Sequence, residues 1–251
     1  MKREQPNGKT KQETQTMDTG RLALLDTISL KRGSHVSFED GVCVMEAAAY
    51  VAGEAHSDHP ACVSGVIGVL MRTWNDDLRT DADRDRLLKP LVPTIIGTRG
   101  TDEDEQVRAW MAFDWLVREH LPAWLELAGG GLAAHAAALR ALPEITDSEA
   151  VSKARPVIDA AWDAARDALA ARDALAARDA LAMAAMAARD ALDALDAMDA
   201  ALDAMAALDA MDASSARARL APTVALLQES AVALVERMAA VGRVLDQGEE
   251  S

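Results

Sequence analysis

The sequence predicts an all-α protein in which a compact N-terminal domain of several helices precedes a long Ala- and Asp-rich helix and a C-terminal heptad-patterned helix that packs antiparallel. Apolar residues recur at helical spacing, and no alternating run of Val, Ile and Thr bounded by turns indicates a strand. Four of the five Trp and both Phe precede residue 125, so the large apolar side chains gather in the N-terminal half. Alanine dominates the remainder, which favours helix but buries little surface per residue.

The composition divides the chain into five segments. Residues 1–20 are polar and lack the apolar stretch of a secretory signal, which predicts a disordered tail. We expect a compact helical domain over 21–142, an Ala-rich region with RDALAA repeats over 143–221, an amphipathic helix over 222–246 and a short tail over 247–251. No uncharged run approaches the roughly 18 residues of a membrane span. Two cysteines do not make a disulfide framework, so a cytoplasmic protein is expected.

The first two helices of the domain are predicted from caps and spacing. Ser37, followed three residues later by Asp40, is typical of an N-cap and predicts a helix over 38–52 that ends at Gly53. Pro60 fits the first position of a second helix. Its apolar residues follow at i, i+4, i+7 and i+11, and they are Val63, Ile67, Leu70 and Trp74.

The rest of the domain is predicted to contain three more helices. Between residues 75 and 97, polar residues and two prolines disfavour a long regular element. Thr101, followed by acidic residues, is predicted to cap a helix that runs to about His120. Pro122 then starts a shorter helix ending at three glycines, and another covers about 132–142.

A long helix is predicted to start at Pro156, because no Gly or Pro follows from Val157 until Pro222. Straight from 157 to 213, it would measure on the order of 85 Å at about 1.5 Å per residue. A row of aspartates follows the RDALAA repeats without an intervening Lys or Arg, and its members are Asp190, Asp193, Asp196, Asp199, Asp203, Asp209 and Asp212. A solvated face is the simplest interpretation, with nucleic-acid charge mimicry and a weak cation surface as alternatives.

The C-terminal segment carries the most regular apolar spacing in the chain, alternating steps of four and three along Leu220, Val224, Leu227, Ala231, Leu234, Met238, Val241 and Leu245. Two serines and Pro222 allow the chain to reverse before it. The seam is therefore expected to pack antiparallel on the long helix or back on the N-terminal domain, with a coiled-coil homodimer as the alternative.

The net charge of −15 argues against direct nucleic-acid binding and against an anionic membrane surface, because both require clustered Lys and Arg. A protein partner stays compatible with the composition. The acidity is also explained by the need to keep an Ala-rich helix in solution.

The densest group of chemically active residues lies around residues 43–62. Cys43, His56, His59 and Cys62 have the residue types of a two-Cys, two-His zinc site, although their spacing is not that of a familiar one. The alternative is that no cofactor binds, both cysteines are buried and the loop caps the second helix.

An enzymatic version of the same cluster uses its histidines together with nearby carboxylates as metal ligands or as general acid and base, and the carboxylates are Glu46, Glu54 and Asp58. No nucleophile elbow, phosphate-binding loop, dinucleotide fingerprint or HExxH motif accompanies them.

Several short motifs carry a family resemblance: Gly33-Ser34-His35, Glu39-Asp40-Gly41 with Cys43, Met45-Glu46-Ala47, Gly53-Glu54 with His56-Ser57-Asp58-His59-Pro60, Trp74-Asn75-Asp76, Gly97-Thr98, Asp114-Trp115-Leu116 and Pro122-Ala123-Trp124-Leu125. Through them the segment from Leu24 to about Leu142 resembles a family of uncharacterised proteins of actinobacteria and their phages. The family usually has Pro where this chain has Ala55, and its Ala-rich repeats vary in length and composition. The resemblance implies a phage or mobile-element association, a spacer role for the repeats and no particular activity.

Three functions follow as hypotheses. The first is a non-enzymatic helical interaction or scaffold protein, since no catalytic motif accompanies the long helical region. The second is a metal-dependent enzyme that uses His56, Asp58 and His59. The third is an acidic inhibitor that mimics DNA.

Overall fold

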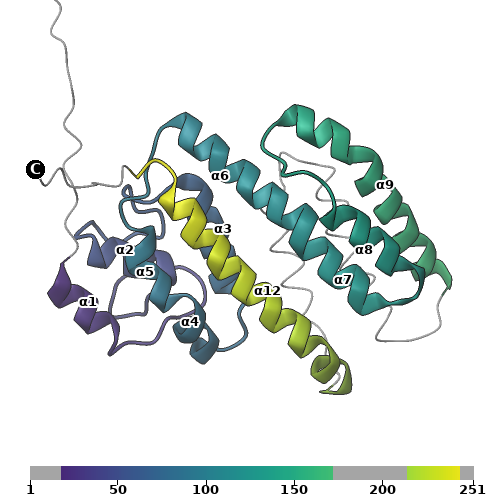
Figure 1. Cartoon of the computed structure of the whole chain (residues 1–251). Coiled ribbons are helices and arrows are strands. Elements are labelled where there is room, and N and C mark those ends of the chain that lie inside the picture. The colour runs from purple at the N-terminus through teal and green to yellow at the C-terminus, as the bar shows by residue number, and fades with distance from the viewer. Residues whose placement is uncertain (1–17, 172–213, 244–251) are drawn as a thin grey trace, which may run out of the picture.

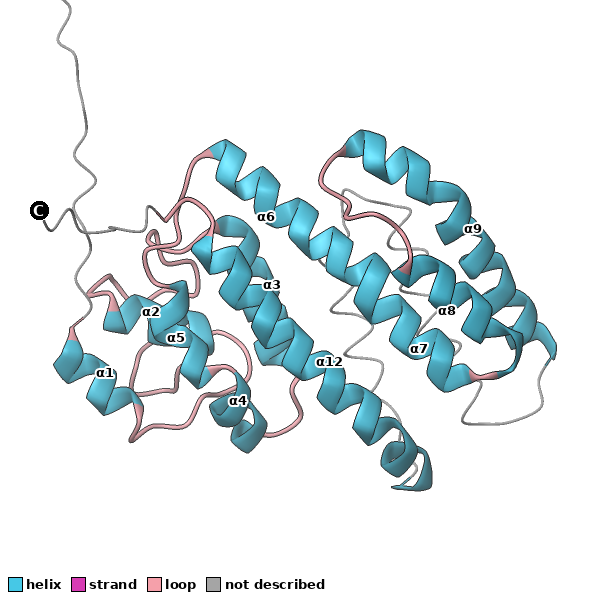
Figure 2. Ribbon diagram, in the orientation of Figure 1, coloured by secondary structure: helices cyan, strands magenta, loops and turns pink. Residues whose placement is uncertain are grey.

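The computed structural model describes residues 18–171 and 214–243, and within these ranges the chain forms helices and loops without a strand (Figure 2), which confirms the all-α prediction. Short helices α1 (Thr19–Leu25), α2 (Val44–Val51), α4 (Asp81–Leu87) and α5 (Val92–Ile95) gather at one end of the body (Figure 1). Helix α8 (Ala133–Arg140) and helix α9 (Ser148–Ala171) lie at the other end. Helix α12 (Ser214–Ala240) crosses the body between them.

Helix α2 begins later than predicted. Ser37 hydrogen-bonds the Asp40 carboxylate and its carbonyl accepts from the Asp40 N–H, so these two residues close a turn instead of opening a helix. Gly41 then adopts φ 136°, outside the helical region. Cys43 is the N-cap, and it forms a capping box with Glu46.

Helix α3 (Gly65–Asp77) also starts later than Pro60, with Ser64 as its N-cap. The Glu54 carboxylate accepts hydrogen bonds from the N–H groups of Ala61 and Cys62, at 2.6 and 2.9 Å, and holds that stretch as a turn. The predicted apolar face is confirmed, since Val63, Ile67, Leu70 and Trp74 are all buried.

The polar stretch after α3 contains a helix that the spacing did not predict. Thr80 caps α4, in which only Arg84 and Leu87 are buried. The 3₁₀ segment η1 (Lys89–Leu91) and α5 follow, each with a proline in its first turn, so the expected lack of a long element holds.

Helix α6 (Asp102–Trp115), the π-helical segment η2 (Leu116–His120) and α7 (Leu121–Ala128) follow one another without a break, where two separate helices were predicted. The predicted cap at Thr101 is confirmed as a capping box with Asp104. In η2 the Leu121 N–H bonds to the Leu116 carbonyl, and this wider turn accommodates Pro122 in the first turn of α7. A 3₁₀ turn, η3 (Gly130–Leu132), leads into α8.

His120 lies at the end of η2 with its ring fully buried. Its Nε2 accepts a hydrogen bond of 3.0 Å from Trp124 Nε1, while its Nδ1 has no hydrogen-bond partner among the described residues. Burial lowers the pKa of His120 from 6.5 to about 3, so the folded protein keeps this ring neutral.

We expect His120 to make the protein less stable as the pH falls from 6.5 towards 3. The unfolded chain binds a proton in this window that the folded chain does not, so the stabilisation is full above pH 6.5 and declines by up to about 1.4 kcal/mol per pH unit below it. The variant His120→Gln keeps an acceptor for Trp124 and should flatten this dependence. Urea midpoints at pH 7 and pH 4.5 measure it, with His59→Gln, at a side chain that is 66% exposed, as the control. An unchanged slope in His120→Gln would contradict the prediction.

Helix α9 starts at Ser148, eight residues before the predicted start, and Pro156 lies inside it. The Asp147 carboxylate accepts from the Ala150 N–H at 2.8 Å and supplies the cap. The buried face of α9 is built mainly of small side chains, Ala154, Ala161 and Ala165 with Ile158, and it packs on α8. The rest of the predicted long helix, including the repeats beyond Ala171 and the row of aspartates, lies outside the described residues.

Helix α12 starts at Ser214 rather than near residue 222, so the predicted reversal does not occur at Ser215, and Pro222 lies inside the helix. The described part of the seam points into the protein core, with Leu220, Leu227, Ala231, Leu234 and Met238 all buried. The helix packs against α3, α5, α6 and α7 and runs antiparallel to α6 (Figure 1). The seam was predicted to pack either on the long helix or on the N-terminal domain, and the structure shows it on the N-terminal domain. A coiled-coil dimer through this seam would have to displace these contacts.

Two arginines hold the C-terminal end of α12 on the body through hydrogen bonds to backbone carbonyls. Arg108 of α6 is 1% exposed and donates hydrogen bonds to the carbonyls of Met238 and Val241, at 3.0 and 2.8 Å. Arg243 donates in the opposite direction, to the carbonyls of Thr94 in α5 and of Ile96, its C-cap. Both sets of bonds satisfy carbonyls at helix ends, which otherwise lack partners.

One buried cluster connects residues of α9 and α12 with the core of the N-terminal helices. Within the described ranges no helix is long and apolar enough to cross a membrane. The division into the segments 21–142, 143–221 and 222–246 stays a prediction.

Candidate functional site

Buried Glu46 and the partly buried side chains of His35 and His56 form a polar group, named here the His–Glu–His cluster. Glu46 comes from the first turn of α2 and its side chain is 1% exposed. Its Oε2 lies 2.8 Å from His35 Nδ1, and its Oε1 lies 3.5 Å from His56 Nε2. A buried carboxylate therefore lies between two imidazoles that come from loops on either side of α2.

Backbone groups complete the environment of Glu46. The His35 N–H donates to Oε1 at 2.5 Å, and the Cys43 N–H donates to Oε2 at 2.7 Å. These bonds compensate for burying the carboxylate. Glu46 thus joins the loop at His35 to the start of α2.

The bonds fix the tautomers of both rings. His35 Nδ1 faces a carboxylate oxygen and donates to it, so the Nε2 of neutral His35 carries a free lone pair. His56 Nε2 lies 3.0 Å from the His35 carbonyl and donates to it. The side chain of His35 is 14% exposed, so protein atoms surround most of its ring. The cluster can orient an imidazole base.

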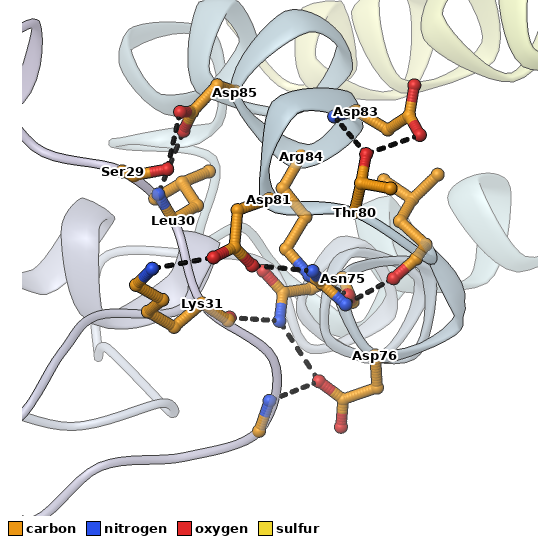
Figure 3. Close-up of polar contacts among 12 residues, drawn as sticks. Ser29, Leu30, Lys31, Asn75, Asp76, Thr80, Asp81, Asp83, Arg84 and Asp85 are labelled. Carbon is orange, nitrogen blue, oxygen red and sulfur yellow. Dashed lines mark hydrogen bonds and ion pairs between the residues drawn. The ribbon is translucent and has the colours of Figure 1, made fainter.

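Asn75 and Asp76 of α3 hold the loop that carries His35 (Figure 3). Buried Asn75 donates to the Lys31 carbonyl at 2.9 Å and accepts from the Val44 N–H at 3.2 Å. Asp76 accepts from the Gly33 N–H at 2.8 Å. The motif Trp74-Asn75-Asp76 therefore acts as a helix end that fixes both the loop and the start of α2.

Helix α4 holds the same segment a few residues earlier (Figure 3). Asp85 accepts from the Leu30 N–H at 2.8 Å and from the Ser29 hydroxyl at 2.7 Å, and Asp81 pairs with Lys31. Buried Arg84 donates to Asp81 and to the carbonyls of Asn75 and Leu78, which locks α4 to α3. The charges of this polar stretch thus serve to position the loop.

Gly41 leaves the room that the His35 ring occupies. A Cβ at this position would lie 2.8 Å from His35 Cδ2 and 2.9 Å from Nε2, and φ is 136°. Only glycine fits both conditions. The sequence Glu39-Asp40-Gly41 is therefore explained by the packing of an imidazole 6 residues earlier in the chain.

We expect Gly41→Ala to lower the free energy of unfolding by about 2–3 kcal/mol, because it strains the backbone and displaces His35. Gly33→Ala is the matched control, since Gly33 also has positive φ (78°) but a Cβ there would meet nothing within 4 Å. Its effect should be only about 1 kcal/mol. Urea denaturation compares the variants, and equal effects at both positions would show that His35 does not depend on Gly41.

The other residues predicted for a site lie outside the His–Glu–His cluster. His59 is exposed and pairs with Asp58 at 2.7 Å. Glu54 holds the turn at Ala61 and Cys62. The polar residues predicted around this loop thus meet in separate pairs: Glu46 approaches His56, while His59 pairs with Asp58 and Cys62 with Glu54.

Both cysteines are buried and free. Burial, together with the nearby Glu46 carboxylate, raises the pKa of the Cys43 thiol to about 12. Burial and a hydrogen bond to Glu54 raise the pKa of Cys62 to about 12 as well. At neutral pH both are therefore thiols, which are poor nucleophiles and poor metal ligands until deprotonated.

No group of three or more His, Cys, Asp or Glu in the described part of the chain is arranged to hold a metal ion. The predicted zinc set of Cys43, His56, His59 and Cys62 is divided between different partners: Cys43 caps α2, His56 faces Glu46 and His59 faces Asp58. Zinc binding itself stays a prediction.

His35 was not among the site residues predicted from the sequence. It lies 11 residues before Glu46 in a loop, and no local spacing links the two. The one signal was its place in the motif Gly33-Ser34-His35, which was used only for the resemblance.

A cavity of about 270 Å³ lies elsewhere, and its lining comes from the α8–α9 connection and α9: Leu142, Pro143, Asp147, Glu149, Ala150, Lys153 and Ala154. None of these residues belongs to the His–Glu–His cluster. No protein-family model matches the chain, and no curated protein or solved structure matches it.

Proposed function

We propose that this chain is a non-enzymatic helical interaction or scaffold protein. The observation that carries the proposal is that the chemically active side chains of residues 35–62 are engaged in holding the fold. Glu46 and Glu54 each accept two backbone N–H groups. The two cysteines stay protonated at neutral pH. Groups that must accept structural bonds are poorly placed to exchange protons or bind a substrate.

The position of α12 supports the same proposal. Helix α9 packs on α8, and helix α12 packs on the core of the N-terminal helices. Residues 172–213 thus connect two helices that both belong to the body. We propose that they act as a spacer presented by it, as the variable repeats of the resembling family imply. The association with a phage or mobile element depends on that resemblance alone.

Small-angle X-ray scattering coupled to size exclusion tests the spacer. A compact protein of 251 residues has a radius of gyration of about 18 Å. We expect a clearly larger value for the full chain, and a value close to the compact one after residues 172–213 are deleted. A full chain as compact as the deletion variant would exclude an extended spacer. Unchanged urea midpoints confirm that the deletion leaves the body folded.

A second candidate function is acid–base or metal-dependent chemistry, now centred on His35 rather than on His59. The oriented His35 ring favours it, because a carboxylate that fixes Nδ1–H leaves Nε2 as a base or ligand. Elemental analysis of the purified protein and melting with and without chelator test this candidate. A bound transition metal that is lost in His35→Gln would support it, and metal-free protein with unchanged melting would remove the metal-dependent form.

A further inference from the structure

The wide turn η2, which joins α6 to α7, leaves one backbone carbonyl without its usual donor. In an α-helix the Val117 carbonyl would accept from the N–H of Leu121, four residues later. That N–H bonds instead to the Leu116 carbonyl, and the next residue, Pro122, has no N–H. Val117 is 0% exposed, so water at the protein surface does not replace the missing donor.

His120, in the same turn, carries a second buried polar atom without a protein partner. Its Nε2 accepts from Trp124 Nε1 at 3.0 Å, so the neutral ring carries its proton on Nδ1. That N–H is a donor with no hydrogen-bond partner among the described residues, and the residue is 0% exposed. Buried polar groups that lack a protein partner are commonly satisfied by an ordered internal water.

The helical backbone directs the two atoms towards the same space. Val117 and His120 belong to one turn, three residues apart. Helical carbonyls point towards the C-terminal end of the helix, whereas side chains lean towards the N-terminal end. The Val117 carbonyl therefore points towards His120, and the His120 ring leans back towards Val117. Since Nδ1 bonds no protein atom directly, a small molecule between the two groups would satisfy both.

The surroundings of His120 favour a neutral molecule. Helices α8 and α12 pack on the turn, and the rings of Trp115 and Trp124 lie beside His120 with centroids at 5.0 and 6.1 Å. The charged residues of the turn are used elsewhere, since Arg118 pairs with a carboxylate of α6 at 3.1 Å and Glu119 is exposed. An ion in this apolar setting would be costly to bury, whereas a water accepts one hydrogen bond and donates another.

We propose that this turn binds one internal water, which accepts from His120 Nδ1–H and donates to the Val117 carbonyl. The water takes the place of the N–H that Pro122 lacks, so that α6 and α7 continue past a proline without a break (Figure 1). Such a site is independent of the proposed scaffold role.

Nuclear magnetic resonance of the full chain tests the site. The imidazole signal of His120 Nδ1–H is identified as the one lost in His120→Gln. We expect this proton to show a nuclear Overhauser effect to a water that tumbles with the protein, and rotating-frame spectra separate this effect from proton exchange. The Nε1–H of Trp124, which donates to His120, is the control and should show a much weaker effect. No effect at Nδ1–H, or a ring that carries its proton on Nε2, would overturn the proposal.

Replacing Pro122 distinguishes a bridging water from one held by His120 alone. Pro122→Ala restores an N–H five residues after Val117, which can donate to its carbonyl and continue the wide-turn pattern. The water then keeps only one of its two partners, and its effect on the His120 proton should fall several-fold. Pro93→Ala is the matched control, because Pro93 also lies in the first turn of a helix, α5, and should leave the effect unchanged. An undiminished effect in Pro122→Ala would show that the Val117 carbonyl does not hold the water, and the bridge would be wrong.

Discussion

Replacing Arg108 with Ala is expected to lower the free energy of unfolding by about 4 kcal/mol. The guanidinium is almost fully buried and serves three acceptors: the carbonyls of Met238 and Val241 at the end of α12 and the carboxylate of Glu105 at 2.7 Å. Its removal leaves two carbonyls and one carboxylate without this donor. Urea denaturation followed by circular dichroism measures the loss.

We expect Arg108→Ala to loosen the end of α12 before the whole protein unfolds. Glu105 also accepts from the Ser64 hydroxyl and the Val66 N–H at the start of α3, so Arg108 links α12, α6 and α3. Hydrogen exchange in Arg108→Ala should rise first at the end of α12. Arg86→Ala is the matched control, since Arg86 also contacts α12 but its side chain is 60% exposed. Its effect should stay below about 1 kcal/mol, and a similar loss in both variants would contradict the role assigned to Arg108.

The role of Arg108 could not be predicted from its sequence context. Glu105 and Arg108 are three residues apart on a helix, a spacing typical of an exposed ion pair. In the structure Arg108 is buried and bonds carbonyls of α12, more than a hundred residues later in the chain. The apolar seam itself was predicted, because its spacing of four and three is a local property of α12, and so was its need for a covering surface. Which surface covers it depends on tertiary packing.

The start of α2 shows a different limit of prediction from the sequence. Serine is a usual N-cap whereas cysteine is not, so the sequence pattern indicated Ser37 and gave no sign that Cys43 caps the helix. What decided the outcome was Glu46, which closes the capping box with Cys43 while receiving bonds from His35. The local pattern contained the capping pair, but the reason for its use lies in a loop held by Asn75 and Asp76 of another helix.

Contacts between distant segments also explain why some site residues were predicted and others were missed. Glu46 and His56 were selected because reactive residue types cluster along the sequence there, and the structure joins them. His59 and Cys62 were selected for the same reason, but Asp58 and Glu54 are closer partners for them. Density along the sequence identifies a polar region, whereas the positions of loops decide which of its side chains meet.

Glu46→Ala is expected to lower the free energy of unfolding by about 3 kcal/mol, because the buried N–H of Cys43 and the partly buried N–H of His35 lose their acceptor. Glu46→Gln keeps one acceptor oxygen and should lose roughly half as much. Glu39→Ala, at an exposed carboxylate in the preceding loop, is the control and should be almost neutral. Urea denaturation orders the three variants.

The imidazole of His35 supplies a second measurement that a purely structural role of Glu46 would not change. In the natural chain the carboxylate holds the proton on Nδ1, so Nε2 carries the lone pair. An amide nitrogen in Glu46→Gln donates to Nδ1 and shifts the proton to Nε2, and imidazole ¹⁵N chemical shifts distinguish the two tautomers. If both proteins show the same tautomer, Glu46 acts only as a cap for α2 and does not orient His35 as a base.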